Sequence, residues 1–151
     1  MVPQTNPVLF LISKLWLYSK GNRGQVVLYV TLFLGANTVG FVEPFIVAHV
    51  LNTIQTQGVT SANIFYIVAV SSLLIVTTLA FWAFHGPARV IETRNAFIAR
   101  ANFKKYLVEG VLDLPSAWHT DHHSGDTIDK ISKATEGLYR FSSDTFEGIG
   151  S

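Results

Sequence analysis

Two long apolar runs dominate the first half of the chain, over residues 26–50 and 64–84. Between residues 24 and 88 the only formally charged residue is Glu43. Each run exceeds the roughly 20 residues that an α-helix needs to cross about 30 Å of hydrocarbon. Each is also apolar on all faces, which is unusual for a helix at the surface of a soluble protein. The pattern predicts two transmembrane helices, the first over residues 25–51.

The second helix is predicted to continue beyond the membrane, over residues 61–113. After Phe84 the sequence stays rich in the helix formers Ala, Arg, Lys, Glu and Leu. A continuous helix of this length would be roughly 80 Å long, whereas a bilayer holds only about 30–45 Å of it. The remainder is therefore expected to stand in the cytoplasm. We expect Pro87 either to bend the helix near the inner membrane surface or to break it.

A third helix is predicted after a proline stop. Pro115 ends the long helix because the residue before a proline is pushed toward extended geometry. A short polar segment then covers residues 115–124, and a helix is expected over residues 126–149, with Ser124 or Asp126 capping its first N–H groups. Its apolar residues recur at helical spacing, at Ile128, Ile131, Leu138, Phe141 and Phe146. The predicted fold class is an all-α membrane protein whose third helix returns toward the membrane.

The basic residues predict the orientation in the membrane. Residues 1–23 contain three basic residues and no acid, five basic residues lie between residues 89 and 105, and the linker at residues 52–61 carries no charge. By the positive-inside rule, both ends lie in the cytoplasm and the linker lies outside. We expect a multi-pass integral protein of the plasma (inner) membrane, with a cytoplasmic N-terminus.

Residues 7–19 read as a short helix lying in the membrane interface. Trp16 would anchor this helix while Lys14 and Lys20 meet lipid headgroups. A disordered leader is the alternative. A cleaved signal peptide is not indicated, because no positive residue precedes the apolar run and no small-residue cleavage site follows it.

Composition narrows the function classes. Of the 151 residues 49% are hydrophobic and only 14% are charged, against about 25% charged in soluble domains. A disordered chain is excluded, and a net charge of +1 gives no field that would attract nucleic acid. The chain has no cysteine, so it has no disulfide, no thiolate zinc site and no cysteine nucleophile.

Three features are candidates for chemistry, and each has a second interpretation. A cluster of imidazoles and carboxylates could bind a divalent ion or form a solvated polar loop, the interpretation we favour; its members are His119, Asp121, His122, His123 and Asp126. Glu43, before Pro44, is either an outer gate or substrate contact, or a carboxylate near the outer boundary at a kink. Asn37 lies nearer mid-bilayer and either faces a translocation path or holds a neighbouring helix. Gly35 and Gly40 would allow a neighbouring helix to approach closely.

The residues between the second and third predicted helices resemble a known family. The segment Leu114-Pro115-Ser116-Ala117-Trp118-His119, followed by Ser124-Gly125-Asp126, resembles the first intracellular loop of ABC exporters. That loop has a leucine-proline pair, two aromatic residues, a polar stretch and a glycine-acid step. His119 replaces the usual second aromatic. The interfacial helix, short outer loop and inward extension also look like the N-terminal part of such a membrane domain.

The resemblance implies a mechanical role in transport. In the family the loop forms a coupling helix that docks on a nucleotide-binding domain, so Trp118 and His119 would be anchors, Pro115 and Gly125 would set the corners, and Asp126 would belong to the contact. No G-x-x-x-x-G-K-[ST] phosphate loop occurs in residues 1–151. We expect no enzyme activity and no cofactor in this chain, with ATP and Mg bound by a nucleotide-binding domain outside it.

The expected partners are the lipid bilayer, that nucleotide-binding domain, a second membrane domain in a homodimer or heterodimer, and a transported small molecule, lipid or peptide. Two other functions stay open. One is a two-span dimeric signalling or scaffold protein with a cytoplasmic helical hairpin. The other is a metal-handling membrane protein built on the histidine cluster.

Overall fold

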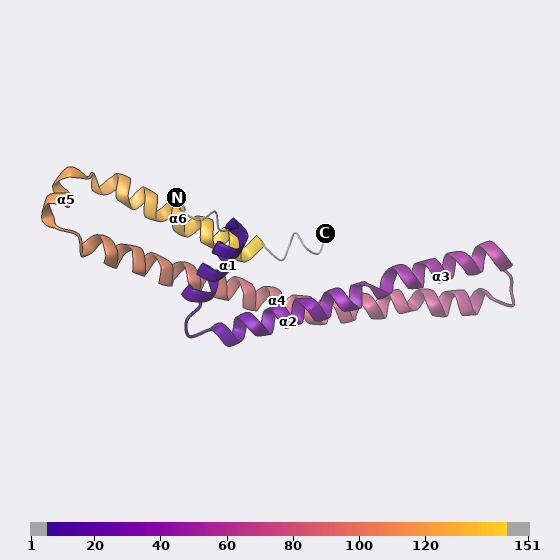
Figure 1. Cartoon of the computed structure of the whole chain (residues 1–151). Helices are drawn as coiled ribbons and strands as arrows, with labels where there is room; N and C mark the ends of the chain where they lie inside the picture. Colours follow the sequence, from indigo (N-terminus) through magenta and orange to yellow (C-terminus); the bar gives the residue numbers. More distant parts are fainter. Residues whose placement is uncertain (1–5, 145–151) are drawn as a thin grey trace. The chain divides into compact units, whose positions relative to one another are not determined.

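The computed structural model of the chain describes residues 6–144, and 88% of these are helical, with no strand among them. The all-α class is therefore confirmed. Figure 1 shows the six helices, which are α1 (Pro7–Tyr18), α2 (Arg23–Gly40), α3 (Val42–Gln57), α4 (Ile64–Leu112), α5 (Ser116–Asp121) and α6 (Ser124–Asp144). Two apolar segments are long enough to cross a membrane, Arg23–Gln57 and Ile64–Leu112. The predicted end of the third helix, at residues 145–149, and Phe146 lie outside the described residues.

The described chain forms two compact units. The apolar unit is Leu28–Arg89, and the charged unit combines residues 6–27 with residues 90–144. The boundary along α4 follows Pro87 by two residues. The helix continues through Pro87 without interruption, so the interpretation in which this proline breaks the helix is wrong.

The first apolar segment is interrupted, whereas one helix over residues 25–51 was expected. α2 ends at Gly40 and α3 begins at Val42, with Phe41 between them. Pro44 explains the place of the break, because its nitrogen cannot donate to the Gly40 carbonyl and its ring would clash with that carbonyl. Phe41 still donates its N–H to the Asn37 carbonyl at 3.0 Å, which closes the last turn of α2.

The linker between α3 and α4 is shorter than the predicted residues 52–61. α3 continues to Gln57 because its polar residues are satisfied within the helix: the Thr53 hydroxyl donates to the His49 carbonyl at 2.9 Å. Gly58 ends the helix with a positive φ of 67°, a conformation that glycine adopts without steric cost. Only residues 58–63 then connect α3 to α4.

Aromatic rings fill the contact between α2 and α4 in the apolar unit. A Cβ placed on Gly35 would lie 3.5 Å from the ring of Phe84, and one on Gly40 would lie 3.9 Å from the ring of Phe81. Both glycines therefore lie against aromatic side chains of α4, with no backbone atom of α4 among the nearest neighbours, so the expected close approach of two helices is not seen at either position. The spacing is ordinary van der Waals contact, so an alanine would also fit at either position.

The charged unit is built around a small core between α1, α4 and α6. Its buried members are Leu15, Tyr18, Ala99 and Leu138, with Phe103 packed against them. The alanine lets the helices approach, and the larger side chains from the other two helices fill the space above it.

α4 and α6 run in opposite directions within the charged unit (Figure 1). Arg100 pairs with Glu136 at 3.0 Å, and the rings of Phe97 and Tyr139 lie 5.0 Å apart. Residues earlier in α4 thus meet residues later in α6, as an antiparallel hairpin requires. Of the predicted apolar face of α6, Leu138 is buried whereas Ile128 is 63% exposed, so only part of that face packs against other helices.

Candidate functional site

The segment expected to form a coupling loop contains a short helix held between two corners. Pro115 takes the N-cap position of α5 with φ of −57° and ψ of 148°, and its carbonyl accepts the N–H of Trp118 at 2.9 Å. His122 ends α5 in an extended conformation, with φ of −122° and ψ of 124°. The chain therefore leaves α4, makes one turn and a half of helix, and enters α6 at Ser124.

Gly125 does not form the second corner. It lies in the first turn of α6, whose start at Ser124 precedes the predicted start by two residues. The only glycines with positive φ in the described part of the chain are Gly21 and Gly58. His122 makes the corner with ordinary extended geometry, so the turn does not depend on the conformational freedom of a glycine.

Trp118 is packed against its own loop. Its ring stacks on the ring of His122 with centroids 4.2 Å apart and planes at 11°, and it meets the edge of His119 at 5.3 Å. The Nδ1 atom of His122 lies 3.0 Å from the Trp118 carbonyl, which can only accept, so Nδ1 carries the proton and donates. Two residues of the predicted docking contact, Trp118 and His119, are thus brought together, with Trp118 half-buried and His119 exposed.

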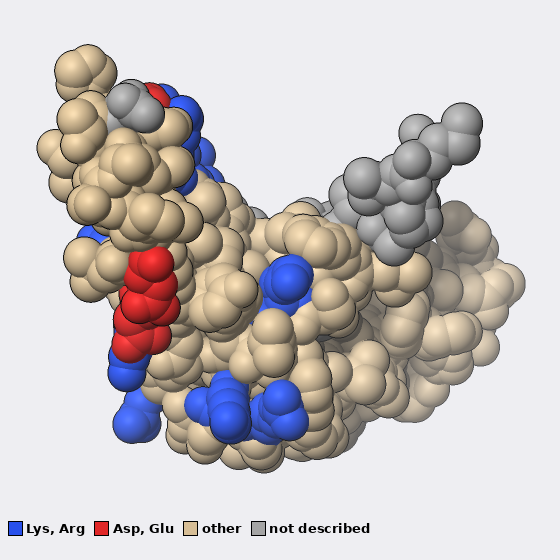
Figure 2. Space-filling model, turned by 60° about the vertical axis from the view of Figure 1, so that its left-hand side comes forward, with Lys and Arg blue, Asp and Glu red and all other residues tan. Residues whose placement is uncertain are grey.

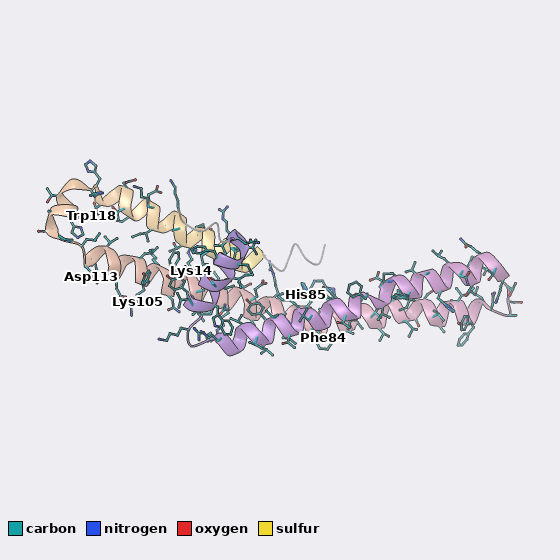
Figure 3. The ribbon with its side chains drawn as sticks, viewed as in Figure 1. Lys14, Phe84, His85, Lys105, Asp113 and Trp118 are labelled. Carbon is teal, nitrogen blue, oxygen red and sulfur yellow. The ribbon has the colours of Figure 1, made fainter. Side chains whose placement is uncertain are left out.

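A groove with a volume of about 520 Å³ lies between the end of α4, α5 and the start of α6. We call it the α5 groove. Apolar side chains from α4 and α6 form two of its walls, and the indole and imidazoles of α5 and the following corner form the third; its members include Val111, Leu112, Trp118, His119, Ile128 and Ile131. Figure 3 shows Trp118 at this turn between the two longer helices.

Asp126 is engaged within α6. Its Oδ2 atom accepts from Lys130 Nζ at 2.7 Å, one helical turn along. The hydrogen bond from Lys130, followed by the positive charge of that lysine, lowers the pKa of Asp126 below its usual value. The next pair repeats the pattern: the hydrogen bond to Asp129, at 2.7 Å, raises the pKa of Lys133. Both carboxylates lie in the first turns of α6, where negative charge also favours the helix dipole.

The histidines do not converge on a point in the described part of the chain. The side chain of Asp121 lies outside the described residues; among the side chains that the structure does describe, no three His, Asp or Glu groups could hold a metal ion. One of the three imidazoles of the loop, that of His122, is turned onto Trp118 and hydrogen-bonded to its carbonyl.

Glu43 and Asn37 belong to the apolar unit, away in sequence from the loop residues of the charged unit. Glu43 is exposed in the first turn of α3, where its charge favours the helix N-terminus. Asn37 is half-buried on α2, and its backbone carbonyl closes the turn before the break.

Two imidazole contacts in the apolar unit were not expected from the sequence. His49 Nε2 lies 2.7 Å from the hydroxyl of Tyr66, which links α3 to α4. His85 stacks on Phe81 with centroids 4.9 Å apart and meets the edges of Phe33 and Trp82 (Figure 3). A histidine inside a long apolar run was the available signal, because a buried or lipid-facing imidazole needs a partner.

A polar contact in the charged unit was also missed. The Asn95 side-chain amide donates to the Ser19 hydroxyl at 3.0 Å, and both residues are fully buried. Asn102 donates to the Tyr18 carbonyl at 2.7 Å. Together these two amides of α4 fix the end of α1. Their spacing of seven residues, two turns of one helix face, was the signal in the sequence.

Comparisons with protein-family models, with curated proteins and with solved structures found no match to this chain.

Proposed function

We propose that the chain is the N-terminal part of the membrane domain of an ABC exporter, and that its charged unit couples the movements of an ATP-binding domain to the helices that form the substrate path. The observation that carries this proposal is the short helix α5, held by Pro115 and His122 between two long antiparallel helices. The first of these, α4, also contains an apolar run long enough to cross a membrane.

The exposed apolar surface supports a membrane location. The most apolar stretch of α4 has no residue buried inside the chain. Large side chains on α3 and α4 are almost fully exposed, including Phe45 at 75% and Phe65 at 83%. Apolar surface of this extent requires lipid or another membrane helix to cover it. In this proposal a second membrane domain and the remaining helices of the exporter cover part of it.

Stiffness in the α5 segment supports the coupling role. A segment that transmits movement needs a fixed shape, and Trp118 is held by His122 through both ring stacking and a hydrogen bond. Ala117 and His119 of α5 are exposed, so both side chains can meet a partner. ATP and Mg would be bound by that partner, and this chain would contribute no catalytic residue.

The first test is the membrane topology. Because the chain has no cysteine, a maleimide can label it only at a cysteine that is introduced. The single variants Gln57→Cys and Thr120→Cys are expressed in cells and exposed to a maleimide that cannot cross the membrane. The proposal expects labelling of the first in intact cells and of the second only after permeabilisation. The reverse pattern would exclude a cytoplasmic coupling loop.

Partner capture is the second test. A photo-crosslinking amino acid at Ala117, with Lys104 as the matched exposed position on α4, is introduced into the protein in its own cells. We expect Ala117 to crosslink to a polypeptide that contains a phosphate-loop motif, or to such a domain encoded after residue 151, and Lys104 not to do so. Crosslinking of Ala117 only to a second copy of α5 would contradict the proposal and favour the dimeric signalling function.

A further inference from the structure

A second groove, with a volume of about 610 Å³, lies between α1 and the cytoplasmic part of α4 in the charged unit. We call it the α1–α4 groove. Lys14 of α1, Lys20 of the turn that follows it, and Lys105 of α4 all line it. Figure 3 labels Lys14 and Lys105 on these two helices. In the space-filling view that brings the α5 end forward, Lys and Arg side chains gather in patches on a largely uncharged face (Figure 2).

The charge of the α1–α4 groove is unbalanced. Glu109 is the only acidic residue among those that line it, against the three lysines. Its carboxylate lies 3.7 Å from Lys105 Nζ, and both side chains are more than 60% exposed. An exposed ion pair of this kind contributes little to stability. An anionic ligand can therefore replace Glu109 as the partner of Lys105 at a small cost in free energy. Three lysines and one carboxylate leave a net charge of +2, which one negative charge on a ligand would halve and two would balance.

Neutral hydrogen-bond donors surround the lysines. The Tyr18 and Tyr106 side chains line the same groove, with ring centroids 5.9 Å apart. Burial, and secondarily the neighbouring Tyr106, raises the pKa of Tyr18, so its hydroxyl keeps the proton and can donate it. Asn102 already donates to the Tyr18 carbonyl, the last of α1. This hydrogen bond engages a carbonyl at the C-terminal end of α1. The partial negative charge of that carbonyl would otherwise repel an anion.

The outer surface of α1 indicates which kind of anion fits. Six of its large apolar side chains are exposed, namely Val8, Leu9, Phe10, Ile12, Trp16 and Leu17. Leu17 also lines the α1–α4 groove, so apolar surface continues directly from the basic site. A helix with exposed apolar residues beside lysines is typical of one lying at a membrane surface, and basic pockets on the cytoplasmic side bind anionic headgroups.

We propose that the α1–α4 groove binds the phosphate of an anionic phospholipid headgroup, with Lys14, Lys20 and Lys105 as its charged ligands and the acyl chains lying along the exposed apolar side chains of α1. A soluble phosphate compound shares the headgroup chemistry but offers nothing to the apolar surface. The proposal needs the chain to lie in a membrane and does not need it to be an exporter.

The test uses the whole chain in nanodiscs of phosphatidylcholine that contain a minority of phosphatidylglycerol, with retained lipid measured by native mass spectrometry. The variant K14Q/K20Q/K105Q is compared with K104Q/K130Q/K133Q, which removes the same charge from lysines outside the groove. A lysine near an anionic surface raises affinity roughly fivefold, so the groove variant is expected to lose roughly a hundredfold in phosphatidylglycerol affinity. The control variant is expected to keep the wild-type affinity to within a few fold.

Two outcomes would overturn the proposal. Equal losses in the two variants would mean that the lipid responds to net charge and not to this groove. The second outcome is that millimolar inorganic phosphate or glycerol 3-phosphate displaces bound phosphatidylglycerol as strongly as added lipid does. The groove would then be assigned to a soluble ligand. Far-UV circular dichroism checks that both variants keep the helical content of the wild type. Failure of the cysteine topology test would refute the membrane orientation separately, so the two proposals can fail independently.

Discussion

The apolar unit and the charged unit differ in what they expose and in what they bury. In the apolar unit large rings point outward, as at Phe45 and Phe65, and only Glu43 and Arg89 carry a formal charge. In the charged unit the polar residues Ser19 and Asn95 are fully buried and hydrogen-bonded to each other. One chain therefore meets two kinds of surroundings, and the contacts that stabilise one unit would be of little use in the other.

Truncation of the core of the charged unit is expected to have the largest effect. Leu138 is 3% exposed in the cluster with Leu15, Tyr18 and Ala99. Leu138→Ala should cost about 2–5 kcal/mol of local stability, because it leaves a cavity where α1, α4 and α6 meet. Amide hydrogen exchange of the chain in nanodiscs would show faster exchange over α1 and α6.

The matched control for Leu138→Ala is Ile128→Ala on the same helix. Ile128 is 63% exposed, so its truncation should change stability by no more than about 0.5 kcal/mol. If exchange in α2 and α3 also rose with Leu138→Ala, the two units would not be separate in stability.

The buried amide contact is expected to give the next largest effect. Asn95→Ala removes the donor to the Ser19 hydroxyl and leaves that hydroxyl buried, which should cost about 1–3 kcal/mol. The double variant S19A/N95A removes both partners and should be less destabilised than the sum of the two single variants. Strict additivity in thermal unfolding would show that the two groups do not depend on each other.

The sequence was a good guide where one physical signal dominated. The two apolar runs and the stop at Pro115 predicted helix type and approximate place, because length, composition and proline chemistry each act locally. The break at Phe41 was expected only as a kink, since the sequence does not say whether a helix will open three residues before Pro44 or bend around it. The extension of α3 to Gln57 was missed because threonine hydroxyls bonded within the helix resemble loop residues in a sequence.

The candidate loop was predicted less completely than the helices around it. Its residues were identified, yet the stacking of Trp118 on His122 and the helical position of Gly125 depend on how two distant helices close on each other. The α1–α4 groove unites residues that are far apart in the sequence, such as Lys14 and Lys105, which no periodicity connects. Contacts of this kind are set by tertiary packing and have no local signal.

The link between His49 and Tyr66 offers a smaller test, this time in the apolar unit. Tyr66→Phe keeps the ring and removes the hydroxyl that lies 2.7 Å from His49 Nε2. The expected cost is about 0.5–1.5 kcal/mol, seen as faster hydrogen exchange around Gly58. Thr56→Ser, which keeps a hydroxyl close to the same loop, is the control and should leave exchange unchanged. No change in the Tyr66 variant would mean that ring packing alone holds the linker ends of α3 and α4 together.

The smallest expected effect is a pH dependence confined to the start of α6. Because its hydrogen bond with Lys130 lowers the pKa of Asp126, this pair stabilises the folded helix at neutral pH and down to the usual aspartate value of 3.8. That contribution is lost as the pH falls through the lowered value. The raised pKa of Lys133 acts in the opposite direction. The stability that Lys133 contributes is present below the usual lysine pKa of 10.5 and is lost as the pH rises through the raised pKa of the folded helix.

Helicity at the start of α6 should therefore be constant between about pH 5 and pH 9 and should decline at both extremes. Both groups are fully exposed, so the change is expected to be small and to weaken with added salt. It can be followed by the amide signals of residues 124–130 in nuclear magnetic resonance spectra. The variant Asp126→Asn should flatten the acid limb and leave the alkaline limb in place, because Asp129 and Lys133 remain paired. A loss of helicity in the apolar unit over the same acid range would contradict the assignment of this pH dependence to the charged unit, since Glu43 is the only formally charged acid between residues 28 and 89.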